Sequence, residues 1–346
     1  RLRNVFPIFL LQAQHGPGPC LPAPDKAMIT TSSFRPAWWL RGPHLQTLYP
    51  SLFRRRAHPV LQRERLELAD GDFIDLDWCG DSSGPVVLVL HGLEGSLQSH
   101  YTGGILQALA ASGYRAGLMY FRGCSGEPNR LARSYHSGET GDLASVLQHI
   151  RRRHRDTPVA VIGYSLGGNV LLKWLGETGS DNDVATAVAV SVPFDLDLAA
   201  RKLERGLSRI YQRHLLQKLR HSAAARSRRA ALPLSAAQLG ALKTFRQFDN
   251  AVTAPLHGFR DVDDYYNRSS SRAFLRGIIT PTLIIHAQDD PFLPATAIPT
   301  GEMLGPATTL ELSAAGGHVG FIAGDRPGRP RYWLETRICG HLRQHL

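Results

Sequence analysis

The residues best suited to chemistry are a serine and the glycines that flank it. Gly163-Tyr164-Ser165-Leu166-Gly167 follows the aliphatic run Val159–Ile162 and precedes a segment with helical periodicity, 166–177. Glycines two positions before and two positions after the serine allow a strand and a helix to pack closely around a sharp turn. The hydroxyl of Ser165 would then lie at the N-terminus of a helix, where the helix dipole stabilises developing negative charge. The pattern therefore predicts a nucleophilic serine.

A second match to the same Gly-x-Ser-x-Gly pattern is Gly80-Asp81-Ser82-Ser83-Gly84. Pro85 and another predicted strand follow it, so no helix is available there to stabilise a nucleophile. We interpret this segment as a flexible turn between two strands.

A serine hydroxyl needs a general base, and the base needs a carboxylate that orients it. With a serine turn of this kind, the expected chain order is serine, acid, histidine. His318 stands in Ala315-Gly316-Gly317-His318-Val319-Gly320-Phe321, directly after the last predicted strand. The neighbouring glycines allow this loop to approach Ser165. The position therefore predicts that His318 is the base.

The orienting acid is predicted to be Asp290, which follows the predicted strand Thr282–His286. Its neighbour Asp289 is expected to cap a turn or to face solvent. Asp195, which follows another predicted strand, is the alternative acid. Three later acids are expected to form turns: Asp261, Asp263 and Asp264.

Two backbone N–H groups are needed to stabilise an oxyanion. The first is expected from Leu166, which follows the nucleophile. The second is expected from Leu93, in the loop His91-Gly92-Leu93-Glu94-Gly95 that follows the strand Val86–Leu90. His91 is expected to brace this loop by hydrogen bonding and to take no part in catalysis.

The elements that would position these residues alternate between strands and helices. Aliphatic runs predict buried strands at Pro85–Leu90, Ala116–Phe121, Val159–Tyr164, Val184–Val192, Thr282–His286 and Thr308–Leu312. Helical periodicity is found at 100–112, 139–154, 166–177 and 295–304. This alternation predicts an α/β fold with a mostly parallel central sheet and helices on both faces. Arg65–Trp78, centred on Asp70-Gly71, predicts an antiparallel hairpin at one edge.

The alternation of strands and helices stops between about 195 and 277. Within this segment, residues 199–229 contain ten Lys and Arg and a single acid, Glu204. We interpret 195–277 as a helical lid inserted at the C-terminal edge of the sheet, where open α/β sheets bind their ligands.

The composition narrows the class of protein. The chain has 346 residues, of which 43% are hydrophobic and 20% charged, values that exclude a disordered or fibrous protein. The formal net charge of +11 is typical of proteins that bind nucleic acid or a membrane surface, but arginine-rich composition from GC-rich coding produces it too. No nucleic-acid-binding motif is present, and residues 199–229 account for most of the charge. We therefore expect no nucleic-acid partner, and we consider transient contact of 199–229 with anionic lipid.

Four cysteines, Cys20, Cys79, Cys124 and Cys339, show no metal-ligand spacing. This usage favours a reducing, cytoplasmic location and argues against structural zinc. Residues 1–27 resemble a signal peptide in part, but Pro7 interrupts the apolar run. We expect a disordered or non-native extension, with Met28 as the first residue of a single domain, 28–346.

Several strings taken together resemble the α/β-hydrolase superfamily, specifically its YheT-like branch, which is related to eukaryotic α/β-hydrolase-domain esterases and lipases. The matching strings are Phe34–Leu48, Leu88–Ser96, Tyr120–Arg130, Tyr135–Asp142, Gly163–Asn169, His286–Pro294 and Gly316–Phe321. The resemblance implies a serine hydrolase that cleaves carboxylic esters, with Ser165, Asp290 and His318 as charge-relay residues.

The expected partners are a small ester substrate and water, with no metal or organic cofactor. Two alternatives use the same scaffold: an acyltransferase, and a lipase or acylglycerol hydrolase associated with a membrane surface. The sequence leaves the acyl chain, the alcohol and the oligomeric state open.

Overall fold

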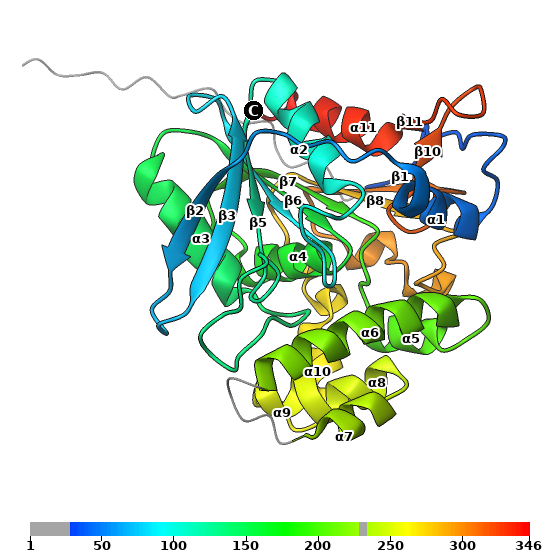
Figure 1. The fold of residues 1–346 in the computed structure, drawn as a ribbon. Coiled ribbons are helices and arrows are strands. Elements are labelled where there is room, and N and C mark those ends of the chain that lie inside the picture. The colour runs from blue at the N-terminus through cyan, green and yellow to red at the C-terminus, as the bar shows by residue number, and fades with distance from the viewer. Residues whose placement is uncertain (1–27, 228–233) are drawn as a thin grey trace, which may run out of the picture.

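A nine-stranded sheet forms the centre of the molecule in the computed structural model, which describes residues 28–227 and 234–346 (Figure 1). The strand order is β1-β9-β8-β7-β6-β4-β5-β3-β2. The strands are β1 Met28–Thr31, β2 Gln62–Glu67, β3 Phe73–Gly80, β4 Val86–Leu90, β5 Arg115–Met119, β6 Val159–Tyr164, β7 Val184–Val190, β8 Thr282–Ala287 and β9 Thr308–Ser313. The predicted extension 1–27 lies outside the described residues.

The pairing confirms a mostly parallel sheet. β1 and β4 to β9 pair with their neighbours in parallel, whereas β3 is antiparallel to both β2 and β5. The β2–β3 hairpin lies at one edge, as its Asp-Gly turn predicted.

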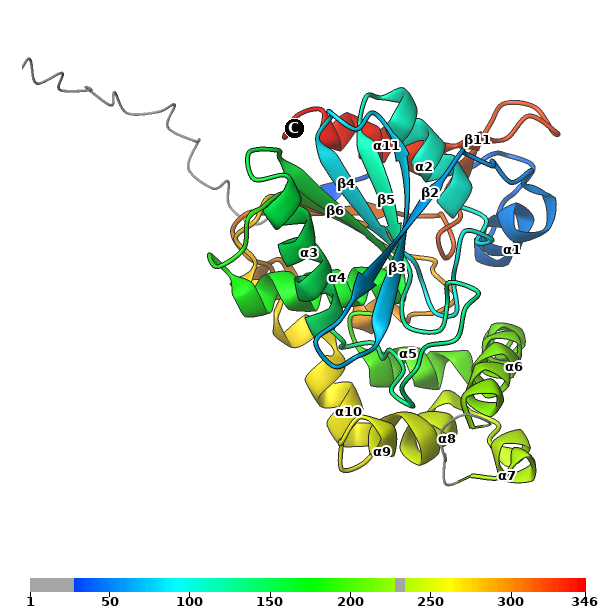
Figure 2. The same ribbon diagram turned by 60° about the vertical axis from the view of Figure 1, so that its left-hand side comes forward.

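Helices cover both faces of the sheet (Figure 2). α3 (Gly141–Arg153) and α4 (Leu166–Thr178) pack on one face, and α2 (Thr102–Ala111) and α11 (Trp333–Leu342) pack on the other. Successive side chains of a strand point to opposite faces. In β4, Leu88 therefore joins the core under α3 and α4, and Val89 joins the core under α2 and α11.

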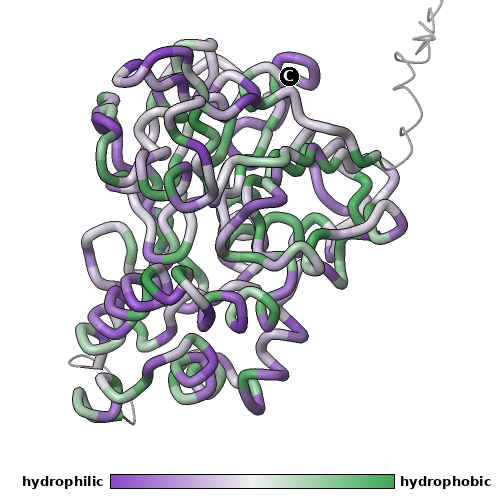
Figure 3. Tube along the Cα trace, turned by 90° about the vertical axis from the view of Figure 1, so that its right-hand side faces the viewer, coloured by the Kyte–Doolittle hydropathy of each residue, from purple (hydrophilic) through white to green (hydrophobic). Residues whose placement is uncertain are grey.

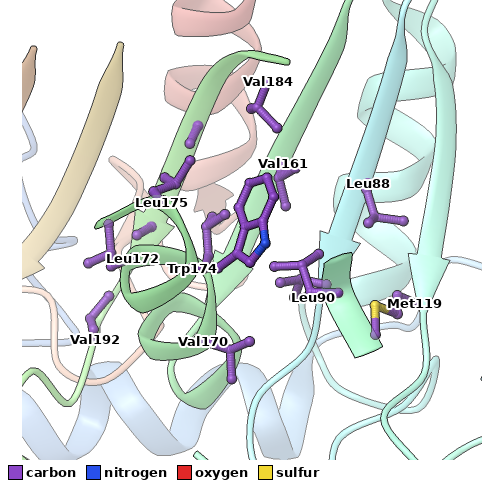
Figure 4. Packing of buried hydrophobic residues seen from close by; sticks show 14 of the residues in the cluster. Leu88, Leu90, Met119, Val161, Val170, Leu172, Trp174, Leu175, Val184 and Val192 are labelled. Atoms are coloured by element: carbon purple, nitrogen blue, oxygen red, sulfur yellow. The ribbon is translucent and has the colours of Figure 1, made fainter. Parts of the chain in front are cut away.

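The packing under α4 explains why the central strands could be predicted from the sequence. Trp174 and Leu175 of α4 pack against the strands, close to Val161 of β6 and Val184 of β7 (Figure 4). Both faces of the central strands are covered, so their sequences are continuous aliphatic runs with no polar alternation.

A helical insertion connects β7 to β8 and forms the lower part of Figure 1. Its helices are α5 Leu196–Leu203, α6 Ser208–Ser227, α7 Ala236–Ala241, α8 Phe245–Phe248, a π-helical turn Asp249–Thr253, α9 Ala254–Leu256 and α10 Val262–Ser269, followed by two 3₁₀ turns, Ser271–Ala273 and Leu275–Gly277. These helices carry both hydrophilic and hydrophobic residues (Figure 3). The hydrophobic ones form a small core of their own, which includes Tyr211, Leu216, Phe248 and Tyr266.

One predicted helix is wrong. Residues 295–304 form two 3₁₀ turns, Ala295–Ala297 and Gly301–Met303. Pro299 separates the turns, because proline lacks the N–H that a helix needs and forces the preceding residue out of the helical region. Ile298 is accordingly extended, with a ψ of 128°.

Several elements have no counterpart in the sequence prediction. They are strand β1, helices α1 (Pro43–Phe53) and α11, and the short antiparallel pair β10 (Ile322–Ala323) and β11 (Arg331–Tyr332). Within the described ranges, no helix combines the length and the apolar character needed to cross a bilayer.

Candidate active site

Ser165 occupies a strained turn between β6 and α4. Its backbone has φ 52° and ψ −117°, a conformation that non-glycine residues adopt only where the surroundings enforce it. The Ser165 N–H donates to the Val190 carbonyl at 2.8 Å. A Cβ on Gly163 would lie 2.5 Å from the Gly167 oxygen, and a Cβ on Gly167 would lie 2.6 Å from the His91 oxygen. The two glycines are therefore required by the close packing that the sequence pattern predicted.

The structure brings Ser165, His318 and Asp290 together. The Nε2 atom of His318 lies 2.9 Å from Ser165 Oγ, and its Nδ1 atom lies 2.8 Å from Asp290 Oδ2. Asp290 is 3% exposed, and its Oδ1 accepts from the Phe292 N–H at 2.8 Å. A carboxylate held in this way fixes the orientation and the tautomer of an imidazole.

Contacts far away in the sequence hold the His318 loop. The His318 N–H donates to Thr47 Oγ1 of α1 at 2.9 Å, and the Val319 N–H donates to Ser191 Oγ at 3.0 Å. The Phe292 ring stacks on the imidazole with 3.8 Å between centroids. Sequence reasoning missed all three supports. Thr47 lies in a string that carried the family resemblance, but nothing in that string specified its partner.

The remaining acids have other partners. Asp289 Oδ1 accepts from the Gly317 N–H at 2.9 Å, so it ties the turn after β8 to the His318 loop. Burial raises the pKa of Asp289. Asp195, the alternative acid, caps α5 by accepting from the Leu198 N–H at 3.0 Å. Asp261 caps α10, Asp263 pairs with Arg246, and Asp264 pairs with Arg260 and Arg268.

The loop after β4 lies against the serine turn. Leu93 and Leu166 line the same cavity as Ser165, and their N–H groups have no hydrogen-bond acceptor among the described residues. His91 lies beneath this loop: Nδ1 donates to the Gly92 oxygen at 2.7 Å, and Nε2 accepts from the Phe121 N–H at 3.1 Å. Burial lowers the pKa of His91 to about 4, so this imidazole is neutral at pH 7.

A cavity with an empty volume of about 800 Å³, part of it open to solvent, extends from these groups. Core residues provide one wall, including Ser165, Leu166 and His318. The insertion provides the other wall with Leu196, Ala199, Ala200, Leu203, Leu215, Leu219, Phe245, Asp249, Thr253, Tyr265 and Tyr266. The side chains are mostly apolar, with a few polar groups, as in small-molecule sites. The cavity can hold an apolar chain next to Ser165, which is hydrogen-bonded to His318 and through it to Asp290.

Residues 85–325 match the protein family described as alpha/beta hydrolase fold. The chain belongs to this family. The Escherichia coli (strain K12) protein named "Putative esterase YheT" is 44% identical over 92% of this chain and 95% of its own length. Phospholipase ABHD3 of Mus musculus is 30% identical over 89% of this chain and 78% of its own length. The Pyrococcus furiosus esterase Pf2001 shares the fold, with a TM-score of 0.55 at 15% identity over 92% of this chain and 99% of its own.

These comparisons confirm the α/β-hydrolase resemblance predicted from the sequence. The second Gly-x-Ser-x-Gly segment of this α/β hydrolase forms the predicted turn between β3 and β4, in which Asp81 Oδ1 accepts from the N–H and the hydroxyl of Ser83.

Three potential metal ligands, His136, Glu139 and His257, lie beside the cavity with ligand atoms within 4.8 Å of one another. Arg133 already donates to Glu139 Oε2 at 2.5 Å. The Gly138 N–H donates to His136 Nδ1 at 3.1 Å, so the ring proton lies on Nε2, which faces Glu139 at 3.6 Å. His257 Nε2 of the insertion lies 3.4 Å from Ser134 Oγ of the core. These contacts fit a hydrogen-bonded brace between the core and the insertion better than a metal centre.

Proposed function

We propose that this α/β hydrolase is a carboxylic ester hydrolase with Ser165 as nucleophile, His318 as general base and acid, and Asp290 as the orienting carboxylate. The observation that carries the proposal is the hydrogen-bonded series Ser165–His318–Asp290, which opens into an apolar cavity. Relatives named as an esterase and a phospholipase support the same reaction class.

In the acylation step, His318 Nε2 takes the proton of Ser165 Oγ, and this oxygen attacks the ester carbonyl carbon. The carbonyl electrons move to oxygen, which accepts from the Leu93 and Leu166 N–H groups. When the carbon–oxygen bond to the alcohol breaks, His318 returns its proton to the leaving oxygen. The product of this step is an acyl ester of Ser165 and a free alcohol.

In the deacylation step, His318 takes a proton from water, and the hydroxide attacks the acyl carbon. The same N–H groups hold the second oxyanion. Collapse of this intermediate breaks the bond to Ser165 Oγ, which recovers its proton from His318. Asp290 stabilises the charged imidazole in both steps.

The test combines a label with a variant. A fluorophosphonate probe should modify the wild type and leave Ser165→Ala unlabelled, and the variant should hydrolyse p-nitrophenyl butyrate at least about 10³-fold more slowly. Ser82→Ala, in the second glycine-serine segment, is the matched control and should behave as wild type. A Ser165→Ala protein with wild-type turnover would falsify the proposal.

The acyl acceptor decides between hydrolysis and acyl transfer. We propose water as the acceptor, because the reaction then needs no second substrate site. Product analysis in the presence of competing alcohols and thiols tests this choice. Free acid should remain the main product, whereas a dominant transfer product would identify an acyltransferase.

We also propose that the 195–277 insertion acts as a lid. The exposed surface formed by α1 and the start of α6 would then contact anionic lipid. Leu45, Leu48 and Leu52 occupy one exposed face of α1, and Leu207 and Ile210 are exposed at the start of α6. His44 of α1 contacts Tyr211 of α6 at 2.9 Å, which places the two apolar faces next to each other. Exposed basic residues accompany them at Arg41, Arg55, Arg56, Arg205, Arg209 and Arg213. Apolar side chains among arginines fit a negatively charged membrane surface.

We propose a cytoplasmic location because the described cysteines form no disulfide bonds. Cys79, Cys124 and Cys339 are free in the described part of the chain. Burial raises the pKa of Cys124 above its ordinary value, which keeps this thiol protonated and unreactive.

A further inference from the structure

The cavity wall contains a carboxyl group that the proposed triad does not use. Asp249 begins the π-helical turn Asp249–Thr253 directly after α8, and it lines the same cavity as Ser165 and His318. π-Helical turns are rare and often occur at functional sites, where they redirect side chains. The neighbours of Asp249 in the wall include Leu203, Phe245 and Tyr266.

The hydrogen bonds of Asp249 leave it incompletely satisfied. Thr253 Oγ1 donates to Oδ1 at 2.6 Å, and the Tyr266 hydroxyl donates to Oδ2 at 2.7 Å. An ionised carboxylate can accept about four hydrogen bonds, so Asp249 keeps unused acceptor capacity in the wall of the cavity. No Lys, Arg or His of the described ranges forms an ion pair with this carboxylate; the nearby Arg246 pairs with Asp197 and Asp263. Even a half-buried charge without a countercharge is costly unless a ligand supplies one.

Burial raises the pKa of Asp249 to about 6, so the group is mostly ionised at pH 7.5. The phenol rings of Tyr265 and Tyr266 and the ring of Phe245 line the same cavity. Aromatic faces beside a carboxylate attract an organic cation by cation–π and charge-assisted hydrogen bonding.

We propose that Asp249 is a specificity-determining residue that binds a positively charged ammonium group carried by the ester substrate. The inference deepens the proposed hydrolase function and rests on it, because the ammonium group and the scissile ester would occupy one cavity. A purely structural reading is that Asp249 only ties the π-helical turn to α10.

The kinetic test compares p-nitrophenyl 6-aminohexanoate with p-nitrophenyl heptanoate, which has a methyl group in place of the ammonium. For the wild type, kcat/KM should favour the ammonium ester. Asp249→Asn should lower that ratio about tenfold to hundredfold, the size expected for a charge-assisted hydrogen bond, because the rate should fall more for the ammonium ester than for the heptanoate. Asp263→Asn, which removes the same charge from exposed α10 surface, should leave the ratio at its wild-type value.

Direct binding separates this inference from the hydrolase proposal. Calorimetry should show tighter binding of hexylammonium than of hexan-1-ol to the wild type, and loss of that preference in Asp249→Asn, even if no ester is cleaved. Equal loss of rate for both esters with an intact hexylammonium preference would mean a structural role and overturn the inference. Equal affinity of the wild type for the two ligands would overturn it without any variant. A preference for hexan-1-ol would instead identify a neutral hydroxyl site and would also overturn it.

Discussion

The two adjacent aspartates after β8 differ at the residue scale in what their oxygens accept. In the proposed mechanism, Asp290 accepts from an imidazole that carries charge during the reaction, whereas Asp289 accepts from backbone N–H groups that include that of Gly317. Asp290→Asn can present an amide N–H to His318 Nδ1 and stabilise the wrong tautomer. We expect kcat on p-nitrophenyl butyrate to fall about 10³- to 10⁴-fold.

Asp289→Asn is the matched control, because its amide oxygen can still accept from Gly317. Its kcat should stay within about threefold of wild type, and both variants should keep the wild-type circular dichroism spectrum. Equal losses in the two variants would reject the assignment of Asp290.

Asp249 predicts a pH-dependent stability effect. Burial raises the pKa of Asp249 from 3.8 to about 6, so the folded state holds a proton that the unfolded state has released between these values. Stability from this group is therefore complete below pH 4 and is lost as the pH rises through 6. The titratable groups that face it, Tyr265 and Tyr266, stay protonated because burial raises their pKa.

The comparison of wild type with Asp249→Asn isolates this contribution. Relative to the variant, the wild type should lose up to about 3 kcal/mol in unfolding free energy between pH 4 and pH 8. Urea unfolding at both pH values measures it. A difference that stays constant with pH would show that the folded-state pKa of Asp249 is not raised.

At the scale of elements, helix α1 positions the His318 loop. Thr47 Oγ1 donates to the Pro43 carbonyl at 2.7 Å and accepts from the His318 N–H at 2.9 Å. Thr47→Val keeps the shape but leaves this buried N–H without a partner. We expect kcat to fall about tenfold with little change in KM, and the protein to lose about 1–3 kcal/mol of stability. Thr47→Ser keeps the hydroxyl and should restore kcat; a Ser variant as slow as Val would mean that methyl packing, not the hydrogen bond, is the cause.

The elements also show what the sequence could and could not predict. The buried strands and the serine turn are local patterns, because aliphatic runs and glycine spacing directly reflect close packing. The structure places the six strands predicted from aliphatic runs within two residues of their predicted ends. The contacts of Thr47, Ser191 and Phe292 with the His318 loop join segments far apart in the chain, so no local spacing encodes them. β1 has four residues and an exposed pattern, and its strand character comes from pairing with β9.

At the scale of the whole molecule, the basic residues of the core and those of the insertion differ in how many form ion pairs. The core pairs many of its arginines internally, as in the buried contacts of Arg122 with Asp70, Asp72 and Asp142. The insertion, by contrast, exposes Arg205, Arg209, Arg213 and Lys218, for which no ion pair is present within the described residues. The basic balance therefore belongs mainly to the surface beside the cavity, where it can affect the approach of a negatively charged lipid surface.

The membrane proposal predicts how binding depends on lipid charge and on α1. Leu52 and Phe53 are 69% and 67% exposed, and burying each in the interface would contribute about 1.5–3 kcal/mol. Co-sedimentation should increase with the phosphatidylserine content of vesicles and fall as salt screens the arginines. The double variant Leu52→Ser/Phe53→Ser should lower the vesicle–water partition constant at least about tenfold. Ile279→Ser, which changes an exposed apolar residue in the segment just before β8, should not change it. Binding that ignores anionic lipid would remove the membrane role while leaving ester hydrolysis intact, because none of these residues contacts Ser165, His318 or Asp290 in the hydrogen-bonded series.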